Sequence, residues 1–160
     1  MYALLILDVQ VGLVHGQEKP WRCEALLATV NELMDKARNA GAPIFLARHV
    51  GPAGSPIAPD SVLTQLAPEL RLAGGEVVFE KHRPNAFTRT ALAEDLRALG
   101  VTGVVIGGMK TQYCVDSTCR ASPVLGLEGG VGADGLSCTA TAQKRAEQVV
   151  AHHNARLEGA

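Results

Sequence analysis

The 160-residue sequence lacks an excess of charge of one sign and lacks any long apolar run. Its 15 lysines and arginines nearly balance its 16 aspartates and glutamates, and no basic stretch extends beyond a few residues. We therefore expect no nucleic-acid partner. No apolar run approaches the ~20 residues that cross a bilayer, so we expect no membrane partner either. The apolar amino terminus has no basic segment before it and predicts a buried strand rather than a signal peptide.

Cysteine is also scarce, and its spacing fits neither a paired metal motif nor a dense disulfide framework. The four cysteines are Cys23, Cys114, Cys119 and Cys138. Because no export signal is recognised, we expect reduced thiols and a cytoplasmic protein.

What the sequence does have is the composition of an ordinary globular protein, with 47% hydrophobic and 19% charged residues. Its length suits one domain with a sizeable core. We expect a single domain over residues 1–160, with truncation at the carboxyl end left as an open alternative.

Strand and helix patterns alternate along the chain. Continuous apolar runs typical of buried parallel strands occupy 3–7, 43–47, 77–79 and 101–106. Apolar residues at helical spacing occupy 23–40, 90–99 and 141–157, with an irregular helical stretch at 63–72. This alternation predicts a three-layer α/β/α sandwich around a mainly parallel sheet.

Two stretches near the carboxyl end fit this pattern poorly. Pro123 falls in the helix expected after the fourth strand and should kink or end it. The glycine-rich stretch 129–135 has low strand propensity and predicts a weak fifth strand at most.

Three groups with chemical potential follow three of the predicted strands. Asp8 closes the first strand, Lys81 follows the third, and Cys114 comes shortly after the fourth and its glycine pair. Singly, they are commonly a loop carboxylate, a solvated lysine and a core thiol. Because carboxyl ends of parallel strands meet at one edge, where ligands bind, together they predict an active site.

Cys114 is the candidate nucleophile of this site. A thiol near the start of a helix meets the positive end of the helix dipole, and a lysine opposite it stabilises the thiolate. We therefore expect a lowered thiol pKa. A low-pKa thiol also oxidises readily, which leaves a redox-sensing role as an alternative.

Three segments resemble the motifs of the isochorismatase-like cysteine hydrolase superfamily, and the resemblance covers nearly the whole chain. They are LILDVQ at 5–10, EKHRPNAF at 80–87 and GMKTQYCVDST at 108–118. The resemblance implies a Rossmann-like hydrolase fold, a small-molecule substrate, no cofactor and a homodimer or larger homo-oligomer.

The resemblance also assigns roles to individual residues. It implies a catalytic triad of Asp8, Lys81 and Cys114, in which Asp8 moves protons and Lys81 is the electrostatic partner of the thiolate. It implies a cis peptide between Met109 and Lys110, and an oxyanion hole made by the backbone N–H groups of Lys110 and Cys114. Such a site cleaves an amide, ureido or carbamoyl C–N bond through a thioester.

The nicotinamidase branch of the superfamily has an Asp-x-His…His metal site, whereas only His49 stands in the corresponding region here, so we expect no metal. Candidate substrate-binding residues are Gln10, Trp21, His49, Phe87 and Tyr113. Two alternatives remain, a vinyl-ether hydrolase of isochorismatase type and a catalytically silent structural or regulatory oligomer. Cys114 argues against the first, and the intact triad argues against the second.

Overall fold

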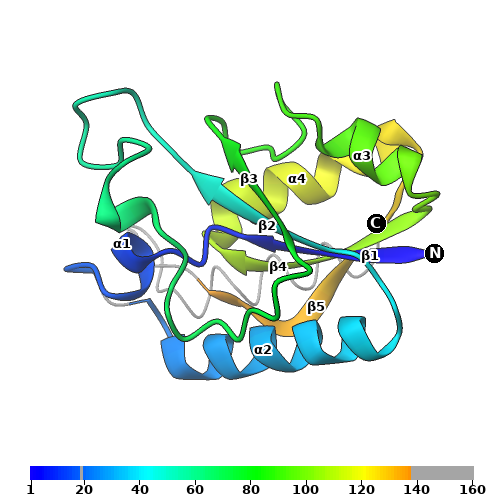
Figure 1. Ribbon diagram of the computed structural model, residues 1–160, viewed down its shortest axis with the longest axis horizontal. Coiled ribbons are helices and arrows are strands. Elements are labelled where there is room, and N and C mark those ends of the chain that lie inside the picture. Colours follow the sequence, from blue (N-terminus) through cyan, green and yellow to red (C-terminus); the bar gives the residue numbers. More distant parts are fainter. Residues whose placement is uncertain (19, 138–160) are drawn as a thin grey trace.

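Five parallel strands form the centre of the molecule, with helices on both faces (Figure 1). The computed structural model describes residues 1–18 and 20–137. The elements are β1 (Tyr2–Leu7), α1 (Val11–Val14), α2 (Cys23–Asn39), β2 (Ile44–His49), a 3-10 turn (Val62–Thr64), β3 (Val77–Lys81), α3 (Leu92–Ala98), β4 (Gly103–Met109), a π-helical turn (Thr111–Val115), α4 (Asp116–Ala121), a second 3-10 turn (Pro123–Leu125) and β5 (Glu128–Ser137).

The strand order is β3-β2-β1-β4-β5. The chain adds β2 and β3 on one side of β1 and then crosses to place β4 on the other side. The order therefore reverses between β1 and β4, which opens a crevice at the carboxyl ends of these two strands. This is the three-layer, parallel architecture that the sequence predicts.

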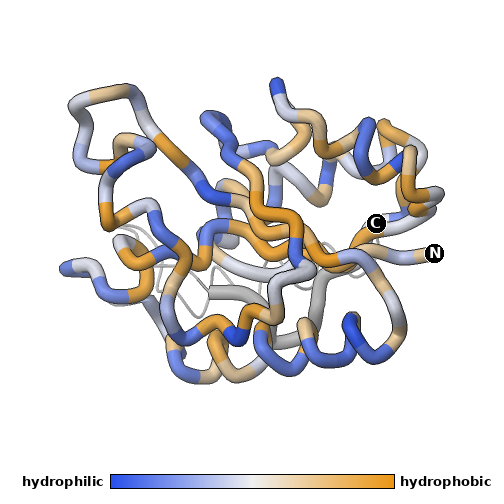
Figure 2. The backbone as a smooth tube through the Cα atoms, in the orientation of Figure 1, coloured by the Kyte–Doolittle hydropathy of each residue, from blue (hydrophilic) through white to orange (hydrophobic). Residues whose placement is uncertain are grey.

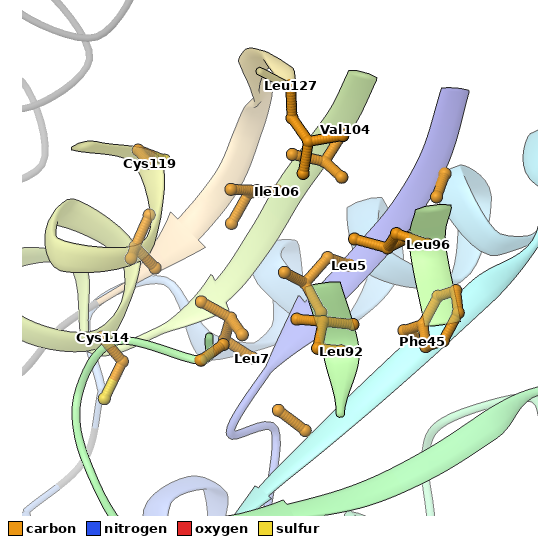
Figure 3. Packing of buried hydrophobic residues seen from close by; sticks show 14 of the residues in the cluster. Leu5, Leu7, Phe45, Leu92, Leu96, Val104, Ile106, Cys114, Cys119 and Leu127 are labelled. Carbon is orange, nitrogen blue, oxygen red and sulfur yellow. The ribbon is translucent and has the colours of Figure 1, made fainter. Parts of the chain in front are cut away.

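Alternation along β1 divides the core into two clusters, one on each face of the sheet. Leu4 and Ile6 pack with the apolar side of α2, which Figure 2 shows as a two-coloured helix with its hydrophilic side turned outward. Leu5 and Leu7 belong to the cluster on the opposite face, together with Leu92 of α3 (Figure 3). Cys114 lies at the end of this second cluster, so the core itself fixes the position of its side chain.

The predicted strands, including the glycine-rich fifth one, are confirmed by the structure. β5 pairs with β4 over Glu128–Val131 and again at Leu136–Ser137, with an irregularity between the two stretches.

Pro123 ends α4 as predicted, because it starts a separate 3-10 turn that closes at Gly126 with φ +76°. Among the described residues no helix is long and apolar enough to cross a membrane.

One local prediction is wrong. The stretch 63–72 is not helical beyond its first residues, because Leu66 forms an extended bridge with Gln10 and Pro68 follows at once. In addition, the sequence patterns predicted no helix where the short helix α1 lies. The predicted helix at 141–157 and Cys138 lie outside the described residues.

Gly108 sets how closely β1 and β4 approach at the carboxyl edge. It is the register partner of Leu7 and has φ +121°, a conformation that side chains rarely adopt. A Cβ atom at this position would lie 2.1 Å from the Leu7 carbonyl oxygen, which is backbone and cannot move aside. Only glycine therefore allows the contact that brings the ends of these two strands together.

We expect Gly108→Ala to lower the free energy of unfolding by about 3 kcal/mol or more, from strain at positive φ combined with a backbone clash. Gly100→Ala is the matched control, because Gly100 has φ +67° but a Cβ atom there would meet nothing within 4 Å. The free energy of unfolding of this control should fall by only about 1 kcal/mol. Urea unfolding measures the free energy of unfolding of both variants. Equal losses in Gly108→Ala and Gly100→Ala would contradict the role given to the contact with Leu7.

Candidate active site

Asp8 follows β1 directly and is held at the floor of the crevice. Its backbone has φ +57°, and its N–H donates to the Ala47 carbonyl at 3.1 Å. The side chain is buried, and Oδ2 lies 3.0 Å from Lys81 Nζ. Among the described residues the other oxygen, Oδ1, is buried and has no hydrogen-bond partner. One carboxylate oxygen thus holds the lysine, while the other remains available for a proton or a donor.

Lys81, the last residue of β3, is completely buried. Its ammonium nitrogen lies 3.0 Å from Asp8 Oδ2, 3.1 Å from His49 Nδ1, 3.2 Å from the Arg83 carbonyl oxygen and 3.3 Å from Cys114 Sγ. An ammonium has three N–H donors, so these four acceptors satisfy it fully. The structure therefore brings together the three residues of the predicted triad.

Cys114 lies in the π-helical turn that joins β4 to α4. Burial raises the pKa of its thiol to about 12; the negative charge of Asp8 acts in the same direction and outweighs Lys81, which lowers it. The expectation of a lowered thiol pKa is therefore wrong for the resting site. It took account of the helix dipole and of Lys81, but not of the burial of the thiol or of the negative charge of Asp8, which was already placed in the same site.

The turn before Cys114 also differs from expectation. The described backbone contains no cis peptide, so the bond between Met109 and Lys110 is trans. The glycine at 108 and the π-helical turn provide the change of direction without the ~3–4 kcal/mol cost of a non-proline cis bond. The Cys114 N–H donates to the Lys110 carbonyl at 3.1 Å, an acceptor that the Tyr113 N–H shares at 3.0 Å. The oxyanion hole at Lys110 and Cys114 stays a prediction.

A cavity of about 380 Å³ opens above Asp8 and Cys114. Its walls are largely apolar and come from short helical turns and loops at the carboxyl edge of the sheet, namely Leu13, Ile57, Leu63, Pro84 and Tyr113. A neighbouring hollow of about 520 Å³ shares His49 and Ile57 with it and is lined by His82, Arg83 and Arg89. A small organic molecule can thus reach the thiol.

Of the five predicted pocket residues, Gln10, His49 and Tyr113 line this cavity. Trp21 and Phe87 do not line it, because both rings pack against the core cluster that contains Leu5 and Cys114. Both aromatic rings cover the core from the loops. Their assignment to substrate binding stays a prediction.

Sequence reasoning missed the apolar wall. Leu13 lies in the unpredicted helix α1, and Leu63 falls in a stretch expected to be part of a longer helix. Ile57 lies in the proline- and glycine-rich connection after β2, in which no apolar periodicity predicts which side chain turns inward.

Asp8, His49 and Cys114 are the one described group whose atoms lie close enough to hold a metal ion, within 4.8 Å of one another. The Lys81 ammonium, however, contacts all three at 3.0–3.3 Å. A buried cation of the protein itself thus occupies the centre of the group, and a second cation beside it would be repelled. These residues do not fit a metal while Lys81 is charged.

Comparisons with known proteins agree with this fold. A family model described as the isochorismatase domain matches residues 2–160. The chain is 33% identical over 134 residues to the secreted isochorismatase effector Isc1 of Verticillium dahliae, covering 83% of this chain and 70% of that protein. It is 31% identical over 124 residues to a streptothricin hydrolase of Streptomyces noursei, covering 78% of this chain and 49% of that protein.

Among solved structures, a crystal structure of an isochorismatase family protein superposes with a TM-score of 0.93 at 28% identity. The match covers 99% of this chain and 93% of that one. The sequence match along almost the whole chain and the shared parallel fold lead to the same conclusion. The chain belongs to the isochorismatase family of hydrolases.

Proposed function

We propose that this protein is a cysteine hydrolase that cleaves the C–N bond of a small amide, ureido or carbamoyl compound. One observation carries the proposal: Lys81 Nζ lies 3.0 Å from Asp8 Oδ2 and 3.3 Å from Cys114 Sγ at the floor of an accessible cavity. The arrangement supports the proposal because hydrolysis by a thiol requires a nucleophile, a proton acceptor and a positive charge close to one point.

The neutral thiol of the resting site defines the first step. With substrate in the cavity, Asp8 takes the thiol proton as Sγ forms a bond to the substrate carbonyl carbon. The negative charge moves from the carboxylate onto the sulfur and then onto the carbonyl oxygen, and Lys81 stays beside the sulfur throughout. In this role Asp8 is a general base, and the unpartnered Oδ1 is the oxygen that receives the proton.

The later steps return the protons. Asp8 gives its proton to the leaving nitrogen, so that ammonia or an amine departs and a thioester remains on Cys114. A water then loses a proton to Asp8 and adds its oxygen to the thioester carbonyl. The C–S bond breaks, Asp8 reprotonates the sulfur, and the acid product leaves. No redox step and no cofactor enter this balance.

The alternatives receive less support from the site. A redox sensor needs an accessible thiolate, whereas burial and Asp8 raise the pKa of the Cys114 thiol to about 12. A catalytically silent oligomer has no need of a buried ion pair beside a buried thiol. A vinyl-ether hydrolase would leave the thiol without a role.

The cytoplasmic location and the homo-oligomer stay predictions. One relative is named as a secreted protein.

We expect Cys114→Ser to reduce kcat/KM by about 10³-fold or more, because a hydroxyl replaces the attacking thiol. The assay is ammonia or amine release from a panel of small amides, ureido acids and N-carbamoyl compounds. Cys119→Ala is the control, since Cys119 is also buried but lies in α4 away from the cavity lining. Equal activity of Cys114→Ser and wild type would remove the nucleophile assignment.

Asp8→Asn should reduce kcat by about 10²- to 10⁴-fold, because the amide cannot take the thiol proton. The same variant should change thiol reactivity in the opposite direction. Asp8 raises the pKa of the Cys114 thiol, so removal of its charge lowers that pKa and increases alkylation by iodoacetamide at pH 8.

Peptide mass spectrometry of Cys114 after brief alkylation between pH 6 and 10 measures this effect. The partly exposed Cys23 is the internal standard in each sample. Slower alkylation of Cys114 in Asp8→Asn than in wild type would contradict the electrostatic account of the thiol.

A further inference from the structure

His49 contacts the lysine of the proposed triad rather than only the cavity. His49 and Lys81 are register partners at the ends of β2 and β3, so their side chains leave the sheet on the same side. The two nitrogens Nδ1 and Nζ are 3.1 Å apart. An ammonium can only donate, so Nδ1 is the acceptor and the imidazole proton resides on Nε2.

The side-chain amide of Gln10 holds the backbone of His49 in place. Its side-chain oxygen accepts from the His49 N–H at 2.8 Å, and its side-chain nitrogen donates to the His49 carbonyl at 3.1 Å and to the Thr64 carbonyl at 2.8 Å. All three contacts are to backbone, and the side chain is 3% exposed. The groups with which this amide would otherwise bind a substrate are thus already engaged.

We propose that His49 is a positioning residue for the Lys81 ammonium, and that Gln10 acts through His49 rather than on the substrate. The proposal rests on the proposed hydrolase function, and it revises the roles expected for these two residues from substrate binding to support of the triad. Gln10 fixes the backbone of His49, His49 fixes the ammonium, and the ammonium faces the sulfur.

The proposed reaction explains why Lys81 needs acceptors other than Asp8. In the resting site the charge of Asp8 attracts Lys81 directly. Once Asp8 has taken the thiol proton it is neutral, and its hold on the ammonium weakens at the moment when the sulfur carries the negative charge. His49 Nδ1 and the Arg83 carbonyl do not change charge in this step. They keep the ammonium beside the sulfur when Asp8 no longer does.

The acceptor role requires a neutral imidazole. Burial lowers the pKa of His49, and Lys81, His82 and Lys110 lower it further, while Asp8 acts against them. These are the charged and titratable groups that face the ring, and the balance keeps Nδ1 unprotonated at neutral pH.

The test compares two replacements of His49 by the alkylation rate of Cys114 at pH 8. His49→Asn offers an amide oxygen near the position of Nδ1, whereas His49→Phe fills similar space without an acceptor. In His49→Phe three acceptors still remain for the three N–H groups of Lys81, but the ammonium is no longer held from the side of His49. An ammonium that shifts away from the sulfur is a weaker partner for the thiolate. We expect alkylation to be roughly five- to tenfold slower in His49→Phe and within about threefold of wild type in His49→Asn.

Gln10→Met provides the second arm, because it touches neither the ammonium nor the sulfur. We expect slower Cys114 alkylation in this variant also, since a displaced His49 releases Lys81. His15→Phe is the matched control, because His15 pairs with Glu69 at the surface. Its Cys114 alkylation rate should equal that of wild type. The Cys23 rate should be unchanged in the His49 and Gln10 variants, and His15→Phe is compared without this standard because Glu69, the partner of His15, also raises the pKa of Cys23.

Unfolding in urea is measured alongside, so that a loss of the fold is recognised directly. Equal rates in His49→Phe and wild type, or equally slow rates in His49→Phe and His49→Asn, would overturn the positioning role. A Gln10→Met variant with normal alkylation and a raised KM would overturn the part of the proposal that concerns Gln10.

The two proposals fail separately. If Asp8→Asn alters alkylation and abolishes turnover while His49→Phe behaves as wild type, only the positioning role is lost. If Cys114→Ser retains hydrolysis, the proposed function itself is lost, whatever the alkylation rates show.

Discussion

The buried ion pair between Asp8 and Lys81 is the constraint on which the rest of the site depends. An ion in the protein interior costs several kcal/mol unless other groups take over the role of water. Lys81 is surrounded by three further acceptors, whereas Asp8 has one oxygen without a partner among the described residues. The pair therefore leaves one buried carboxylate oxygen without a hydrogen-bond partner among the described residues. In the proposed function this is the oxygen that takes the thiol proton.

The fold explains how the pair forms at all. Asp8 and Lys81 follow strands that are not neighbours, because β2 lies between β1 and β3. Lys81 must reach across the end of β2, and His49, the last residue of that strand, lies beside its path. On the other side, the close contact at Gly108 brings β4 against β1 and delivers Cys114 to the same point. Sheet order, register and one glycine thus determine the distances within the cluster.

The strands, the layers and the three reactive residues could be predicted because each depends on local pattern. A buried strand such as β1 is recognisable from its apolar run, and Asp8 is recognisable because it ends that run. The thiol pKa could not be predicted, since it depends on how deeply Cys114 is buried and on how close it lies to Asp8, which is 106 positions away (114 minus 8). The hydrogen bonds of Gln10 could not be predicted for the same reason, because its partners lie 39 and 54 positions along the chain. The packing of Trp21 and Phe87 against the core was not predicted, because an aromatic residue in a loop can cover a core as readily as it can line a cavity.

A high thiol pKa in the resting site is compatible with catalysis by that thiol. A permanent thiolate would react with any electrophile or oxidant that entered the cavity, and so its selectivity would be poor. In the proposed mechanism sulfur becomes a strong nucleophile only when its proton moves to Asp8, and that transfer is favourable only when a carbonyl carbon is ready to take the electron pair. In that mechanism Lys81 would change its principal partner from a carboxylate to the sulfur without moving far, since Asp8 Oδ2 and Cys114 Sγ are 3.0 and 3.3 Å from the same nitrogen. The proposed attack would therefore need little reorganisation, and low reorganisation in a buried site is a principal source of enzymatic rate enhancement.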